Sequence, residues 1–157
     1  MMYNNVYTHS ELFCDNTQKT YTDEATECKF LLGGIGTGNV SVGSRGQFCD
    51  WEIFNKPGKG NYLPYTFFSV WAKEQNGAPK VKILESEIKK PYERSHGYLS
   101  SDLAGVPRLK SAVMKGEYPF ATVDFSDDEL QLKVKMESFT PFIPLNPEDS
   151  GIPGAII

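Results

Sequence analysis

The sequence predicts an all-β fold, namely an antiparallel β-sandwich with long loops and little helix. Few segments have the spacing of an amphipathic helix, whereas several short ones alternate apolar and polar residues, as strands with one buried face do. Gly, Pro and Asn residues separate these segments, which is typical of turns between many short strands. The composition agrees, because 10 Phe, 8 Tyr and 2 Trp are strand-favouring residues in a chain of 157.

One domain of ordinary size is expected from 157 residues, enough to bury a core without disulfides or metals. With 16 basic and 20 acidic residues the net charge is −4, which argues against nucleic-acid binding, because such proteins carry a concentrated basic face. The cysteines Cys14, Cys28 and Cys49 form no CxxC pair, and their odd number predicts reduced thiols. No signal peptide is visible and no apolar stretch is long enough to span a membrane, so the cytoplasm is the expected location.

The first elements are expected as follows. Residues 1–28 form an N-terminal extension with a short helical turn after Thr22, because two acidic residues follow near its positive end. The sandwich domain is expected over residues 29–157, and residues 47–54 are considered as one of its strands. Residues 65–73 are predicted as a central strand covered on both sides, since both faces carry bulky side chains.

Three further strands are predicted downstream. Residues 81–84 and 120–125 are rich in β-branched and aromatic residues, and residues 130–136 alternate Leu, Leu, Val and Met with Gln and Lys. No periodicity is visible over 91–107, which predicts a long exposed loop. Turns are predicted at residues 76–77, 115–116 and 126–128.

A dense glycine motif spans residues 32–40. Glycines can bring backbone N–H groups close to a phosphate. However, the dinucleotide pattern GxGxxG started at Gly34 would need a glycine in place of Asn39, and no Lys stands where GxxxxGK(S/T) requires one. The motif is therefore interpreted as structural, with glycines that adopt positive φ or pack tightly at the start of a strand.

Two carboxylates are the best candidates for catalysis. In the predicted strand Asp50 and Glu52 project from the same face with Cα atoms about 7 Å apart, which suits the acid/base or acid/nucleophile pair of a glycosidase. The competing interpretation is that both carboxylates face water or meet Arg45, Lys56 or Lys59. It is favoured, because nothing in the sequence indicates a perturbed pKa.

Other chemistry finds little support. Trp51 is predicted to belong to the core, because it shares a strand face with Cys49 and Ile53. The two histidines, His9 and His96, are far apart and lack companion ligands, so no metal site is expected. No GxSxG motif supports a serine hydrolase, and no cofactor is expected.

Several segments together resemble the N-terminal region of glycoside hydrolase family 116, which includes the non-lysosomal glucosylceramidases and bacterial β-glucosidases. The resemblance covers most of the chain from about Lys29 to the end, and the motif over residues 50–60 is its most specific part. The matching segments are residues 32–40, 45–46, 50–60, 65–68, 139–146 and 149–150.

The resemblance implies a two-domain parent, in which an N-terminal β-sandwich precedes a larger (α/α)6 barrel. Such enzymes are retaining and use a Glu nucleophile and an Asp acid/base, both in the helical domain, so no residue here is matched to a catalytic role. The (α/α)6 catalytic domain is absent from these residues. Residues 154–157 also read as the beginning of an apolar strand, whereas chain ends are usually loosely held, so the sandwich is expected to be truncated before completion.

The favoured function is that of a non-catalytic N-terminal segment of a β-glucosidase- or glucosylceramidase-like retaining glycoside hydrolase. Its partner would be the downstream (α/α)6 domain of the same parent, which would bind the β-glucoside or glucolipid. The segment would support that domain and could shape one wall of the sugar pocket. The residues expected at the substrate or at the domain interface are Arg45, Asp50, Trp51, Glu52, Asn55 and Lys56.

Two other functions are compatible with the sequence. A free-standing carbohydrate-binding module would use exposed aromatic rings, with Trp51 and Tyr62 as candidates. A structural interaction domain without a ligand would instead expose apolar patches that cause self-association.

Overall fold

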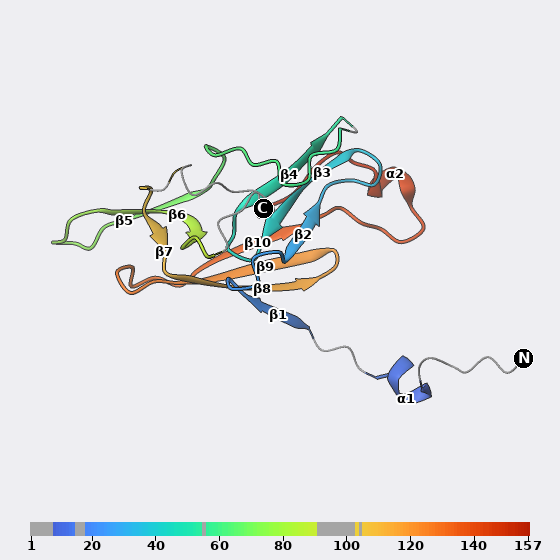
Figure 1. Ribbon diagram of the computed structural model, residues 1–157, viewed down its shortest axis with the longest axis horizontal. Coiled ribbons are helices and arrows are strands. Elements are labelled where there is room, and N and C mark those ends of the chain that lie inside the picture. The colour runs from blue at the N-terminus through green and yellow to red at the C-terminus, as the bar shows by residue number, and fades with distance from the viewer. Residues whose placement is uncertain (1–7, 15–17, 55, 91–102, 104) are drawn as a thin grey trace, which may run out of the picture.

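The computed structural model describes residues 8–14, 18–54, 56–90, 103 and 105–157. Strands dominate these residues and most of them pair antiparallel, which confirms the all-β prediction (Figure 1). The elements in chain order are α1 (His9–Leu12), β1 (Lys19–Thr22), β2 (Lys29–Leu32), β3 (Gly38–Gly43), β4 (Phe48–Ile53), β5 (Ser69–Ala72), β6 (Lys80–Ser86), β7 (Arg108–Leu109), β8 (Ser111–Glu117), β9 (Phe120–Ser126), β10 (Val134–Phe139) and α2 (Pro147–Ser150).

A four-stranded antiparallel sheet in the order β1-β8-β9-β10 forms one layer of the sandwich. Its two central strands bury alternate residues, Ala112 and Met114 in β8 and Ala121, Val123 and Phe125 in β9. This period of two places all five side chains on the face that meets the core. Because β1 pairs with β8, the sheet already includes residues of the N-terminal stretch.

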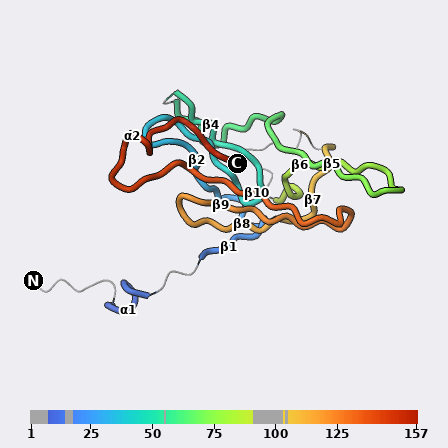
Figure 2. Tube along the Cα trace, turned by 180° about the vertical axis from the view of Figure 1, so that it is seen from behind, coloured from blue at the N-terminus to red at the C-terminus, as the bar shows by residue number. Residues whose placement is uncertain are grey.

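A three-stranded antiparallel sheet in the order β2-β3-β4 lies over that layer, as both views show (Figure 1 and Figure 2). It contributes Leu32, Val42 and Phe48 to a single buried cluster with Leu109 and Met114. Burying each large apolar side chain stabilises the fold by about 1.5–3 kcal/mol, so this cluster holds the two layers together. Helix α1 has no buried residue and lies apart from the sheets.

The third sheet has the order β5-β6-β7, with β5 antiparallel and β7 parallel to β6. Strand β5 is short and lies at the sheet edge, so the prediction of a central strand over 65–73, covered on both sides, is wrong. A turn in which the Thr66 N–H donates to the Leu63 carbonyl keeps the first of these residues out of the ladder. One face of β5 packs on the core, while the other stays open, with Trp71 63% exposed.

The strand predicted over 130–136 is displaced, because β10 begins at Val134. Leu130 is buried as alternation predicts, but Leu132 is exposed. The cause is Asp127, whose carboxylate accepts hydrogen bonds from two following backbone N–H groups, one of them that of Leu130 at 3.0 Å. A side chain that satisfies the backbone locally competes with strand pairing, and here it holds a turn.

The remaining strand predictions are confirmed, since residues 81–84 lie in β6, residues 120–125 in β9, and β4 occupies most of 47–54. The helical turn predicted after Thr22 is wrong, because that segment forms non-helical turns; among the described residues before β1, the helical ones lie in α1. Residues 115–116, predicted as a turn, continue β8 instead.

Long-range contacts explain why no helical turn forms after Thr22. The Asp23 N–H donates to the Ala112 carbonyl of β8, and the buried Asp23 carboxylate accepts the Ala112 N–H at 3.2 Å. These bonds keep the chain against β8 rather than in a helix. Residues 154–157 contribute one bridge to β10 rather than a strand. The loop predicted over 91–107 lies mostly outside the described residues, as does His96.

Candidate functional site

Three of the polar residues singled out from the sequence, Asp50, Glu52 and Lys56, lie at or directly behind one end of the sandwich. The β2–β3 loop, the residues after β4, the β8–β9 turn and the α2 segment meet at this end. We call this region the loop end; it comprises residues 33–37, 53–54, 56–60, 118–119 and 142–152. A cleft of about 380 Å³ opens there. Its walls include Leu31, Gly33, Asn39, Glu52, Lys56 and Tyr118.

A bulge in β4 positions the two carboxylates. Asn39 pairs with Glu52 while Ser41 pairs with Cys49, so two β4 residues lie opposite one residue of β3. The bulged Asp50 has a left-handed backbone with φ 53°, which Asp tolerates better than most residues. Strict alternation is therefore interrupted, although Asp50 and Glu52 both still turn toward the loop that follows β4.

Asp50 is 2% exposed and fully engaged within the protein. Its Oδ1 accepts a hydrogen bond from the Gly60 N–H at 2.7 Å and lies 3.3 Å from Lys29 Nζ, while Oδ2 lies 3.8 Å from Lys59 Nζ. Its own N–H donates to the Asn61 carbonyl at 2.8 Å. Asp50 thus fastens the loop after β4 to both β4 and β2.

Glu52 also holds the loop after β4 in place, but it lies nearer the surface. Its carboxylate accepts hydrogen bonds from the Gly58 N–H at 3.1 Å and from Asn39 Nδ2 at 3.2 Å, and it pairs with Lys59 Nζ at 3.0 Å. These bonds, that from Gly58 above all, hold the pKa of Glu52 below its ordinary value. A glycosidase acid needs a raised pKa, so Glu52 is unsuited to that role. The competing prediction, in which the two carboxylates meet Lys59, is confirmed.

Arg45 lies away from the loop end, in a buried ion triad. It is 2% exposed; its Nη1 lies 3.7 Å from Glu85 Oε2 and donates to the Ser86 carbonyl at 3.1 Å. Arg108 Nε approaches the same Glu85 oxygen at 3.6 Å. Burial raises the pKa of Glu85, and the two guanidinium groups oppose that rise. Arg45 therefore joins the β3–β4 turn to β6 and β7 inside the fold.

The other predicted site residues are divided between interior and surface. Trp51 is half-buried against the core, which agrees with the prediction of a core residue, and lines a shallow pocket of about 200 Å³ with Ile53 and Ala155. Lys56 is exposed at the cleft. Asn55 lies outside the described residues. Of the predicted set, two carboxylates and one lysine thus lie at or directly behind the loop end.

The structural interpretation of the glycine motif over 32–40 is confirmed. The Gly33 N–H donates to Thr140 Oγ1 at 3.1 Å, and the Ile35 N–H donates to the Ser150 carbonyl at 2.8 Å. These bonds attach the loop to the residue after β10 and to the α2 segment, and they occupy N–H groups that a phosphate would need. Three glycines adopt positive φ, which disfavours other residues: Gly33, Gly36 and Gly38, at 140°, 73° and 99°.

Gly33→Ala is expected to destabilise the protein by roughly 3 kcal/mol or more, and Gly36→Ala by only about 1–2 kcal/mol. A Cβ at Gly33 would lie 2.4 Å from the Gly38 carbonyl oxygen, whereas a Cβ at Gly36 would meet no atom within 4 Å and adds backbone strain alone. Urea unfolding of the two variants measures the difference. Equal losses would contradict a steric role for Gly33.

Large apolar side chains are exposed at the loop end, a feature that the sequence predictions missed. Phe54 is 87% exposed and Leu145 is fully exposed, and both have left-handed backbones, with φ 56° and 64°. Such conformations cost about 1–3 kcal/mol each. Leu145 lies in a loop, where hydrophobic periodicity gives no signal, and Phe54, which the sequence placed in a strand, follows the end of β4. The other exposed apolar side chains of the loop end are Ile35, Ile53, Tyr118, Phe142, Ile143 and Ile152.

Two properties of the described residues bear on the class of site. No group of three or more His, Cys, Asp and Glu side chains in them is arranged to hold a metal ion. In the same part of the chain, no helix has the length and apolar character that crossing a membrane requires. The charged groups of the loop end instead hold the loops in place, and the apolar groups face outward. This arrangement is typical of a contact surface.

The fold and the loop end together define a β-sandwich domain with exposed apolar side chains at one end. A family model described as beta-glucosidase 2, glycosyl-hydrolase family 116 N-term, matches residues 30–157. The chain therefore belongs to the N-terminal domain family of glycosyl hydrolase family 116, as the sequence resemblance indicated. A search of curated proteins found no match. The family description implies that a catalytic domain follows this domain in such enzymes.

Proposed function

We propose that this chain is the non-catalytic N-terminal segment of a β-glucosidase- or glucosylceramidase-like retaining glycoside hydrolase, and that its loop end contacts the downstream (α/α)6 domain. The observation that carries the proposal is the group of exposed apolar side chains at the loop end, which we call the apolar rim. Phe54 and Leu145 are held outward on strained backbones, and covering them would offset that cost by burying apolar surface. Family membership supports the nature of the partner.

Asp50 and Glu52 serve this contact indirectly. They fix residues 58–60 through backbone N–H bonds and share Lys59. A loop that is already fixed loses less conformational entropy when a partner covers it. In this proposal the exposed Lys56 and the apolar rim lie beside the β-glucoside or glucolipid that the helical domain binds, and form one wall of its pocket.

The alternative of a free-standing carbohydrate-binding module gains no support from the aromatic residues first considered for it. Trp51 packs against the core. Tyr62 is half-buried, and its hydroxyl opposes the rise in the pKa of the buried Glu85. Neither residue is an exposed aromatic ring, so sugar recognition by this domain would rest on another ring.

We also propose a cytoplasmic location, which rests on thiol chemistry. Cys14, Cys28 and Cys49 are all free, as is usual in a reducing compartment. Burial raises the pKa of the Cys49 thiol to about 12, so this cysteine is an unreactive core residue.

Two measurements test the main proposal. The purified 157-residue chain is expected not to hydrolyse p-nitrophenyl β-glucoside, because the retaining reaction needs two suitably placed carboxyl groups. In the complete parent enzyme, the double substitution Phe54→Ser and Leu145→Ser is expected to lower the thermal midpoint by about 2–4 °C or more. The same double substitution is expected to leave the midpoint of the isolated chain unchanged, because both side chains are exposed there.

Tyr65→Ser provides the matched control for this experiment. It removes another highly exposed ring, which lies outside the loop end, and is expected to leave the parent enzyme unchanged. Glucoside hydrolysis that persists through rigorous purification of the chain would overturn the non-catalytic assignment. A parent enzyme that is insensitive to the double substitution would overturn the assignment of the loop end as the interface.

A further inference from the structure

We propose that a second site, a groove between the β5–β6 hairpin and residues 129–132, binds a neutral oligosaccharide by stacking a sugar ring on Trp71. This proposal goes beyond the proposed function and does not depend on it. Strand β5 and helix α2 lie at opposite ends of the molecule in both overall views (Figure 1 and Figure 2). The groove is therefore separate from the loop end.

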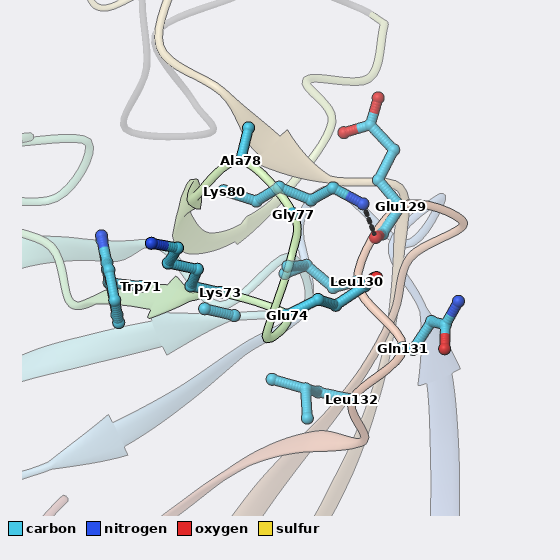
Figure 3. Close-up of a pocket in the computed structure, with 11 residues that line it drawn as sticks. Trp71, Lys73, Glu74, Gly77, Ala78, Lys80, Glu129, Leu130, Gln131 and Leu132 are labelled. Carbon is cyan, nitrogen blue, oxygen red and sulfur yellow. Dashed lines mark hydrogen bonds between the residues drawn. The ribbon is translucent and has the colours of Figure 1, made fainter.

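The groove has a volume of about 520 Å³, against about 380 Å³ for the cleft at the loop end. Trp71 and Lys73 lie on one side of it and residues 129–132 on the other, with the turn of the hairpin between them (Figure 3). Leu130 is buried and forms part of the floor. Lys80 Nζ donates to the Glu129 carbonyl at 2.6 Å and so connects the two walls.

Trp71 is placed as a platform rather than as a core residue. It lies on the outer face of the edge strand β5, opposite Val81 of β6, which is also exposed. The side chains on the other face of β5, by contrast, pack on the core. An indole ring offers a large, rigid apolar surface with one polar edge. The apolar C–H face of a sugar ring is complementary to that surface.

Hydrogen-bonding groups are present on both walls of the groove. Within the described part of the chain, the exposed side chains of Lys73, Glu74 and Gln131 form no hydrogen bond or ion pair, so they are available to a ligand. Together they supply both donors and acceptors. Sugar hydroxyl groups both donate and accept, so an apolar floor with a few polar groups at its rim is suited to them.

The charge of the groove selects a neutral ligand. Its lining carries two lysines, Lys73 and Lys80, and two glutamates, Glu74 and Glu129, so the opposite charges balance. A phosphorylated or acidic ligand would need an excess of positive charge. A wholly apolar peptide would leave the exposed charged groups desolvated and unsatisfied. A neutral polyhydroxyl chain can both stack on the Trp71 ring and hydrogen-bond to the polar side chains at the edge of the groove.

Titration of the 157-residue chain with cellohexaose tests this proposal. Cellohexaose is a neutral, linear, β-linked glucose oligomer whose equatorial hydroxyl groups leave apolar ring faces. We expect saturable binding by calorimetry, with a change in tryptophan fluorescence as Trp71 is covered. Trp71→Ala is expected to weaken binding at least about tenfold. Gln131→Ala, which removes an exposed side chain and cannot disturb the core, is expected to weaken binding about twofold to tenfold.

The controls separate stacking from general adhesion. Tyr65→Ala removes an exposed ring outside the groove and is expected to leave the affinity unchanged. Hexagalacturonate, an acidic oligomer of the same length, is expected to bind at least about tenfold more weakly than cellohexaose. The double substitution Phe54→Ser and Leu145→Ser is expected to leave cellohexaose binding intact, so failure of the interface proposal is distinguishable from failure of this one.

Three results would overturn the proposal. The first is an absence of saturable cellohexaose binding. The second is unaltered affinity in both Trp71→Ala and Gln131→Ala. The third is a set of ligand-induced amide NMR shifts that fall on residues 33–38 and 56–60 rather than on residues 71–78 and 129–132, because the sugar would then occupy the loop end.

Discussion

Glu85→Ala is expected to lower the free energy of unfolding by about 3–5 kcal/mol, because it breaks a buried ion triad. Glu85 is 1% exposed, and its Oε2 lies within 3.7 Å of Arg45 Nη1 and 3.6 Å of Arg108 Nε. Its removal leaves two buried guanidinium groups without their carboxylate. Urea unfolding followed by circular dichroism measures the loss as a lower midpoint at constant slope.

Two other variants serve as comparisons for the stability loss expected of Glu85→Ala. Glu85→Gln keeps nearly the same shape and can still hydrogen-bond, so it is expected to lose less stability than Glu85→Ala. Lys135→Ala breaks an exposed ion pair with Glu137 and is expected to leave the midpoint unchanged, because water screens such pairs. If Glu85→Ala were as stable as Lys135→Ala, the buried triad would contribute nothing to the fold.

Asp50→Ala is expected to cost about 3 kcal/mol and to loosen the loop after β4. The substitution removes the acceptor of the Gly60 N–H and the counter-charge of Lys29, and it places Ala on a backbone with φ 53°. Urea unfolding measures the stability. Limited trypsin digestion reports on the loop, since cleavage after Lys59 is expected to become faster.

Asp50→Asn is the matched comparison. Asn tolerates a positive φ and can still accept the Gly60 N–H, but it has lost the charge that pairs with two lysines. A loss smaller than that of Asp50→Ala is expected. Unchanged stability in both variants, with unchanged cleavage after Lys59, would contradict the role of Asp50 as the residue that fastens the loop.

Much of the fold and part of the site could be predicted from local sequence. Strands β6 and β9 formed where β-branched and aromatic residues are concentrated. The glycine motif predicted positive φ because few other residues accept it, and three of its glycines have it. Lys59 was among the cations expected to meet Asp50 and Glu52, and it does.

The incorrect predictions share a physical cause. Residues 65–73 carry bulky groups on both faces, yet β5 lies at an edge, so Trp71 is exposed. Alternation over 130–136 predicted a strand, yet the Asp127 carboxylate binds the backbone there and forms a turn. In each case a pattern within a few residues was overruled by a contact or an exposure that the pattern does not encode.

The sequence by itself determined the all-β class, the membership in family 116 and the backbone demands of its glycines, because alternation, motif spacing and φ preference are local properties. Only the tertiary structure decided that Arg45 meets Glu85 and Arg108, that Trp71 borders a groove, and that Phe54 and Leu145 project from one loop end. The reason is that burial and charge pairing depend on which distant segments are brought together by folding. Alternation within one strand predicts which side chains share a face. The residues that pack against that face come from distant parts of the chain, so alternation does not predict them.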